Sequence, residues 1–403
     1  MEVTSYTYAI PYLIFLGGLC LLPMHLEFRQ IYSGQSTRAT RRFTVIVFLF
    51  FCGLRGFVIT DWYGYYPYFL QLKTLWSGGL RQLLAGNATF DVGFELYSMI
   101  IKSVCPSYFF WVFASTAIDL ALLHIVFRRY ARYYVFAFAM FFVFGGEVIA
   151  FNLMRNIKSI LLFLLSLKYL QERKILPYML LNVLGMSFHV SSVAYLPLYF
   201  VLHRQFPRWL LWAAFIAGNV LFLLQLQYIQ PLFTFLGNLI GGEVKWKVAY
   251  YFLDQSYGIS IGYVERTLTF IVIMLLRSKL KRQSDHNLLF INLYMAYAFS
   301  FLYFGESHSV TLRMSYLFVG AYWILLPNML ALFRRRRNKE LIVLILVAYS
   351  FIKMLLLNVG AEMRYDNLMF GIKPYQERKE VFEKIYKKGK YAKPESQQKA
   401  SPK

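Results

Sequence analysis

Long apolar runs recur along the whole chain and limit its fold more than any other feature. Most of these runs have roughly 17–24 residues, enough to cross a hydrocarbon core of about 30 Å as a helix. Lipid offers no partners to backbone polar groups, so such segments cross a membrane as helices. The chain has 403 residues and is 58% hydrophobic, which excludes an ordinary soluble domain. We predict an all-α, polytopic membrane protein with about 12 transmembrane helices, in a range of about 10–14.

The expected helices run from end to end of the chain. They lie near 8–26, 44–60, 108–127, 134–150, 153–170, 176–188, 190–202, 209–226, 262–277, 287–304, 309–331 and 340–357. The sixth and seventh runs are both short and could together form one bent or re-entrant unit. We expect residues 1–360 to form a single transmembrane domain and residues 361–403 to form a basic, partly disordered tail.

The net charge of +23 is distributed unevenly between the connecting loops. One set of loops carries 21 Lys/Arg and four acids, and the positive-inside rule makes these loops cytoplasmic. They are 27–42, 128–132, 168–174, 203–208, 277–286 and 333–340. The charge therefore indicates multi-pass insertion in a membrane, with the bilayer rather than nucleic acid as partner.

The opposite side has two long loops, 61–107 and 227–261, which are rich in Tyr, Trp and Gly. Parts of them, near 68–84 and 228–239, have the amphipathic character of interfacial helices. Function is expected to face this outer side. The basic tail from residue 361 conflicts with this assignment of sides. The positive-inside rule would place it in the cytoplasm, but twelve spans from an outer N-terminus leave it outside.

Four arginines lie at or just inside the ends of apolar segments, all on the outer side by the same count. They are Arg55, Arg155, Arg266 and Arg313. A charge in hydrocarbon costs from a few to about ten or more kcal/mol, so such residues usually line a functional cavity. Guanidinium groups gathered at one face favour an anion, with phosphate as the first candidate. The alternatives are pairing with a nearby acid and, for Arg266, an interfacial anchor.

Polar residues accompany these arginines at helical spacing. Asn152 and Arg155 share one helix face with Asn156 and Ser159, and His189 follows Asn182 by seven residues. A histidine on an apolar face is also compatible with a packing role. The chain continues from Arg55 to Asp61 and a group of aromatic residues that includes Trp62 and Tyr65. Such residues form interfacial belts, and they also stack on sugars.

The three cysteines are scattered, and neither a metal-binding spacing nor a nucleotide-binding motif is present. We therefore expect neither a cofactor nor a metal.

Four sequence segments, in this order, resemble the EpsG-like branch of the Wzy-type polysaccharide polymerases, which assemble bacterial exopolysaccharide or O-antigen. They are LRGFVITDWYGYYPYF, DVGFELYSMI, the run from LMRNIKSILLF through SFHVSSVAYLPLYF, and TLRMSYLFVGAYWILLP with NLMFGIKPYQ near the C-terminus. The second segment departs from the family pattern, because Glu95 follows the Gly-Phe pair that it usually precedes.

The resemblance implies a glycosyltransferase that moves a growing glycan from undecaprenyl pyrophosphate to a lipid-linked repeat unit at the outer face of the membrane. Its partners would be undecaprenyl-pyrophosphate-linked glycans, together with chain-length regulator and flippase proteins. Arg155, Arg313 and Arg55 would bind the pyrophosphate. His189 would be the base, with Asp61 and Glu95 as rivals and His308 as a further one. Tyr65, Trp62 and Asn152 would contact sugar.

Three other functions share parts of this pattern. An O-antigen ligase uses the same donor with a different acceptor. A membrane O-acyltransferase also uses an intramembrane histidine, but its donor does not require several outer arginines. A flippase for lipid-linked glycans should show charges along a central path and an internal repeat, and we find no clear repeat.

Overall fold

A computed structural model describes residues 4–242 and 257–388 of the chain. These residues are helical and contain no strand, only three isolated β-bridges. The chain is thus all-α, as predicted. Part of the expected outer loop 227–261 and the end of the expected tail, 389–403, lie outside the described residues.

The chain divides into two compact units that alternate along the sequence. The first comprises Met1–Ala121, Gly146–Ile157 and Val343–Lys403, and the second comprises Leu122–Gly145 and Lys158–Ile342. Each is described by itself. The described part of the expected tail belongs to the first unit, and the expected domain limits stay a prediction.

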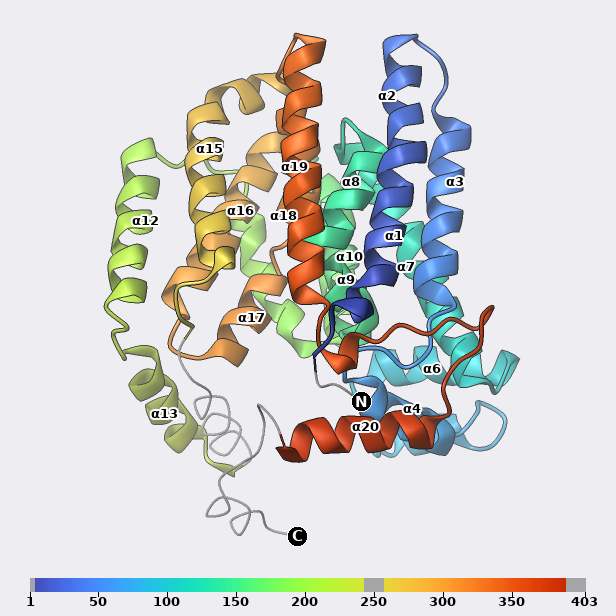
Figure 1. The fold of residues 1–403 in the computed structure, drawn as a ribbon. Helices are drawn as coiled ribbons and strands as arrows, with labels where there is room; N and C mark the ends of the chain where they lie inside the picture. The colour runs from blue at the N-terminus through green and yellow to red at the C-terminus, as the bar shows by residue number, and fades with distance from the viewer. Residues whose placement is uncertain (1–3, 243–256, 389–403) are drawn as a thin grey trace. The chain divides into compact units, whose positions relative to one another are not determined.

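The first unit starts with one long helical stretch and its return (Figure 1). Pro23 has no backbone N–H, and the helix takes a π-turn around it. The elements of this stretch are η1 (Tyr6–Ala9), α1 (Ile10–Leu19), η2 (Cys20–Met24), α2 (His25–Tyr32), α3 (Arg38–Phe48) and η3 (Leu49–Gly53). The rest of the unit is α4 (Trp62–Gln71), α5 (Gly79–Leu84), α6 (Val92–Val104), α7 (Tyr108–Tyr130, to residue 121), α9 (Glu147–Phe151), α19 (Arg336–Leu357, from residue 343), η6 (Ala361–Met363) and α20 (Tyr375–Lys388).

The helix expected over 44–60 ends early, at Gly53. Residues 54–59 are irregular instead, and their backbone pairs with the C-terminal segment. Gly56 N donates to Asp366 O and Ile59 N to Glu362 O, each at 2.8 Å. Arg55 therefore lies outside the helix rather than inside its outer end.

The second unit is built around α8 (Tyr134–Phe141), all of whose residues are buried. The chain kinks within η4 (Phe142–Gly146), where Gly145 has a φ of 79°. The kink removes the Phe144 carbonyl from the helix, and the indole N–H of Trp323 donates to it at 2.9 Å. The other elements are α10 (Met154–Gln171, from residue 158), α11 (Ile175–Phe188), η5 (Val190–Phe200), α12 (Arg208–Leu223), α13 (Ile229–Ile240), α15 (Ile261–Gln283), α16 (His286–Tyr303), α17 (His308–Tyr316) and α18 (Gly320–Leu330).

By length and composition, four helices could cross a membrane: Tyr6–Tyr32, Tyr108–Tyr130, Tyr134–Phe151 and Arg336–Leu357. The count rises to five if α17 and α18, which meet at a bend of 57°, form one span. Helical structure coincides with each expected run, but about twelve spans are not confirmed. Several runs are short helices, and α15 carries charges at both ends.

Candidate functional site

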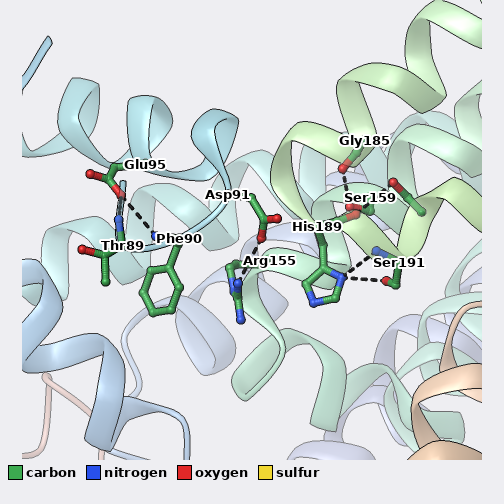
Figure 2. A network of polar contacts seen from close by, with 10 residues as sticks. Thr89, Phe90, Asp91, Glu95, Arg155, Ser159, Gly185, His189 and Ser191 are labelled. Atoms are coloured by element: carbon green, nitrogen blue, oxygen red, sulfur yellow. Dashed lines mark hydrogen bonds and ion pairs between the residues drawn. The ribbon is translucent and has the colours of Figure 1, made fainter. Parts of the chain in front are cut away.

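Arg155 lies in the first turn of α10, within the first unit. Its Nη1 donates to Asp91 Oδ2 at 3.0 Å, and its guanidinium carbon lies 4.5 Å from the centre of the Phe90 ring. The Arg155 and Asp91 side chains are 26% and 22% exposed. Figure 2 shows the two side chains pointing toward one another. An arginine whose charge is paired and yet accessible can exchange its partner for another anion.

The loop that contacts Arg155 is held by Glu95. The Glu95 carboxylate is 1% exposed, and its Oε2 accepts from Thr89 N at 2.7 Å and from Phe90 N at 3.3 Å (Figure 2). Glu95 therefore fixes the backbone that presents Phe90 and Asp91. This geometry favours a positioning role over its predicted part in proton transfer.

Asp61 is held through its backbone by Asn152. The Asn152 Oδ1 accepts from Asp61 N at 2.7 Å, from Thr60 N at 3.1 Å and from Thr60 Oγ1 at 3.2 Å. Asn152 lies in the break between α9 and α10, two residues before α10 begins. The expected single polar helix face is therefore interrupted, and Asn152 instead ties Asp61 to the start of the helix that carries Arg155.

Tyr65 lies close to both charges. Its ring is 5% exposed among Phe90, Phe94 and Trp111. Burial raises the pKa of Tyr65 to about 12, the Asp61 carboxylate adds to this rise, and the neighbouring Arg155 guanidinium opposes it. The structure therefore brings a carboxylate, a guanidinium and a phenol together. The buried ring leaves its hydroxyl as the part that could meet a substrate.

Arg55 is buried, with 3% exposure, and is bonded to protein acceptors. It donates to Thr116 Oγ1 and Ala150 O at 3.1 Å and to the Cys52 carbonyl, and it lies 4.8 Å from the Phe151 ring centre. These contacts join three chain segments and satisfy the charge locally. They favour a structural role, and the pyrophosphate contact of Arg55 stays a prediction.

Trp62 is also buried, with 6% exposure. Its indole N–H donates to Ile59 O at 3.0 Å, and its ring packs on Tyr375 and Phe382 of α20. The adjacent Tyr63 hydroxyl bonds Glu383 of the same helix at 3.0 Å. The C-terminal helix thus covers the residue expected to stack on sugar.

An ion pair fixes this C-terminal segment. Arg378 Nη2 lies 3.0 Å from Asp366 Oδ2, with side-chain exposures of 5% and 11%. Arg378 also donates to the Arg364 carbonyl, and Lys373 N donates to Asp366 Oδ2 at 3.1 Å. Asp366 O also accepts from Gly56 N, so the ion pair also anchors the irregular segment 54–59, which includes Arg55.

His189 belongs to the second unit, at the start of η5. Its Nδ1 lies 2.6 Å from Ser191 Oγ and accepts from Ser191 N at 3.2 Å. A neutral imidazole that accepts at Nδ1 carries its proton on Nε2. Nε2 is then a donor, so these bonds favour His189 as a hydrogen-bond donor to an anion rather than as the base.

Arg313 and Arg266 also lie in the second unit. Arg313 is exposed on α17. The Arg266 guanidinium lies 4.2 Å from the Phe301 ring centre and 5.1 Å from that of Tyr297, and its Nη1 donates to Gly262 O at 2.8 Å. Arg266 thus packs in an aromatic environment, and its role as an interfacial anchor stays a prediction.

Sequence reasoning had not singled out Asp91 or the Asp366–Arg378 pair as site residues. Asp91 was one acid among several in a long outer loop, and Asp366 and Arg378 fell in the expected tail. Their roles depend on contacts with Arg155 and residues 54–59, far away in sequence. Within the described ranges, no three His, Cys, Asp or Glu side chains are grouped as metal ligands.

In a comparison with protein families, a model described as the EpsG family matches residues 38–377, which include every predicted site residue. Comparison with curated proteins and with solved structures gives no match.

Proposed function

Because this chain belongs to the EpsG family, a family of Wzy-type polymerases, we propose that it polymerises a bacterial exopolysaccharide or O-antigen from lipid-linked repeat units. The family and the apolar helices make it a membrane protein of the glycosyltransferase-type polymerase class. The donor, the acceptor and the residues that act on them are the subject of the proposal.

The reaction transfers a growing glycan from undecaprenyl pyrophosphate to a hydroxyl of an incoming lipid-linked repeat unit. The bond between the anomeric carbon and the pyrophosphate oxygen breaks, and a glycosidic bond to the acceptor oxygen forms. The acceptor hydroxyl gives its proton to a base, and undecaprenyl pyrophosphate leaves with the electron pair of the broken bond. A site for this reaction needs a cation for the leaving group and a base for the acceptor.

The observation that carries the proposal is the accessible Arg155 guanidinium next to Tyr65. The Asp61 carboxylate also lies close enough to Tyr65 to affect its pKa. Arg155 would bind the pyrophosphate as negative charge develops on it. Asp61, whose backbone is fixed by Asn152, would take the acceptor proton.

The other predicted roles are kept in revised form. His189 would donate from Nε2 to an anionic oxygen, and Arg313 would be a second pyrophosphate ligand. Glu95 and Arg55 would support the site through their protein contacts. The Tyr65 hydroxyl and the Asn152 amide nitrogen would contact sugar. Trp62 would support the start of α4, the helix that also carries Tyr65.

We propose that the reaction takes place on the outer face of the bacterial inner membrane, in a chain that crosses it about twelve times. Chain-length regulators and flippases would be its protein partners, because polymerisation needs a supply of translocated units.

The test is deletion of the gene, with complementation by wild type, Arg155→Lys, Asp61→Asn and Glu340→Gln, and sizing of the extracted glycan. We expect single repeats in the deletion and full polymer with wild type. Arg155→Lys should reduce polymer roughly 10- to 100-fold, since a bond to a charged group contributes about 1.5–3 kcal/mol and lysine lacks the planar fork. Asp61→Asn should leave single repeats.

Glu340→Gln is the matched control, because it removes an exposed partner of Arg336 at 2.7 Å that the site does not use. It should restore full polymer. A deletion that leaves no glycan on the final acceptor would indicate a ligase. Polymer that lacks only an acyl group would indicate an acyltransferase, and lipid-linked units retained inside the cell would indicate a flippase.

A further inference from the structure

We propose that the Asp91 carboxylate occupies the anion-binding position at Arg155 until the pyrophosphate of the substrate replaces it. The carboxylate holds Arg155 in this structure and moves to the N-terminus of α6 when the pyrophosphate of the substrate takes the guanidinium. This inference rests on the proposed function, and it adds a residue that sets the affinity of the anion site.

The Arg155–Asp91 contact uses only one of the N–H donors of the Arg155 guanidinium. Only Nη1 reaches Asp91 Oδ2, so the pair is not bidentate. Nε is buried and bonds to no described residue. Both side chains are partly exposed, which lets a ligand approach. A phosphate, with more acceptor oxygens than a carboxylate, could use donors that Asp91 leaves unfilled.

Asp91 has a second set of partners within reach. It occupies the N-cap position of α6, and its φ of −58° and ψ of 137° lie outside the helical region, as an N-cap requires. Aspartate is among the preferred N-cap residues, since its oxygen accepts from the first-turn N–H groups. Here the side chain makes no such bond and turns to Arg155 instead. Rotation about the Asp91 side-chain bonds would exchange the guanidinium for the helix N–H groups.

The surrounding loop is suited to this exchange because its backbone is fixed independently of the Asp91 side chain. Glu95 accepts from the N–H groups of Thr89 and Phe90, and Glu95 N donates to Asp91 O at 3.0 Å. Phe90 also keeps its ring against Arg155. Asp91 can therefore leave the guanidinium while Phe90 and Glu95 stay in place.

The exchange predicts the sign of a binding change. In Asp91→Asn the competing charge is gone while an N-cap side chain is kept, so the anion should bind more tightly. Partly exposed ion pairs contribute about 0.2–1 kcal/mol, which corresponds to an affinity gain of about 1.5- to 5-fold. If Asp91 instead positioned Arg155 for the substrate, the same substitution would weaken binding.

The experiment uses the full chain in lipid nanodiscs, with farnesyl pyrophosphate as the probe and farnesol as its uncharged control. Dissociation constants are measured for wild type, Asp91→Asn, Asp91→Ser, Arg155→Lys and Glu340→Gln. Asp91→Ser also keeps an N-cap oxygen without charge, and it provides a second measurement of the dissociation constant if the asparagine variant fails to fold. We expect tighter binding in both Asp91 variants, weaker binding in Arg155→Lys and wild-type affinity in Glu340→Gln.

Weaker or unchanged binding in the Asp91 variants, with wild type preferring farnesyl pyrophosphate to farnesol, would overturn this inference and leave the proposed function standing. If wild type instead bound farnesyl pyrophosphate and farnesol with equal affinity, the chain would have no site that recognises pyrophosphate. The inference would then fail together with the proposed function.

Discussion

At the scale of single residues, the Asn152 amide oxygen holds the turn that carries Asp61, with three hydrogen bonds from residues 60 and 61. We predict that Asn152→Ala lowers polymer synthesis on the order of 10²-fold, since small displacements of a reacting group have effects of this size. Asn152→Asp keeps the acceptor oxygen and should retain more activity than the alanine variant. Rates from glycan sizing over time would compare the two.

Equal loss in both Asn152 variants would show that the proposed contact of the amide nitrogen with sugar matters more than the bonds that the oxygen accepts. Thr60→Val serves as the matched control, because it removes the side-chain bonds from Thr60 Oγ1 to Asn152 Oδ1 and to Asp61 Oδ1 and keeps the backbone bonds from Thr60 and Asp61 to Asn152. It should have a smaller effect than Asn152→Ala.

At the scale of elements, the C-terminal segment braces residues 54–59 and covers α4 (Figure 1). Arg378→Ala would leave the buried Asp366 carboxylate without its cation, at a cost of about 3–5 kcal/mol. We predict a clear fall in the thermal unfolding midpoint of the purified protein and loss of polymer. Lys373→Gln breaks an exposed pair with Glu377 in the same segment and should change the midpoint little. A stable, active Arg378→Ala protein would show that the brace is dispensable.

At the scale of the whole molecule, contacts between the chain ends constrain the topology. Ser5 N donates to Val359 O at 2.8 Å, and residues 56–59 bond to residues 362–366. Both ends and the start of loop 61–107 therefore lie close together, and we predict that the chain between Ser5 and Val359 crosses the membrane an even number of times. With the expected outer N-terminus, this prediction puts the basic C-terminal segment on the outer side as well, against the positive-inside rule.

Cysteine labelling would test that topology. In a background with Cys20 and Cys105 replaced by serine, we predict that Lys384→Cys reacts with a membrane-impermeant maleimide in intact spheroplasts. Ser36→Cys, in the loop between α2 and α3, should react only after permeabilisation. Both positions are exposed, so their difference reports the side of the membrane. Labelling of Ser36→Cys alone would reverse the assignment.

The sequence by itself determined the fold class, the approximate positions of the helices and the family. Apolar length and charge asymmetry are local properties, so they can be read without knowing which segments touch. It also predicted Arg155 as a site residue, because a charge at the end of an apolar run is costly wherever the chain folds.

Only the tertiary structure decided what those charges contact. Asp91 reaches Arg155 across 64 residues, and Asp366 reaches Gly56 across some three hundred. The same long-range pairing ended the helix at Gly53, which an apolar run to residue 60 does not predict. Hydrogen bonds likewise gave Trp62, Arg55 and Glu95 internal partners. Partner choice depends on three-dimensional proximity, and residue spacing along one helix or loop carries no information about it.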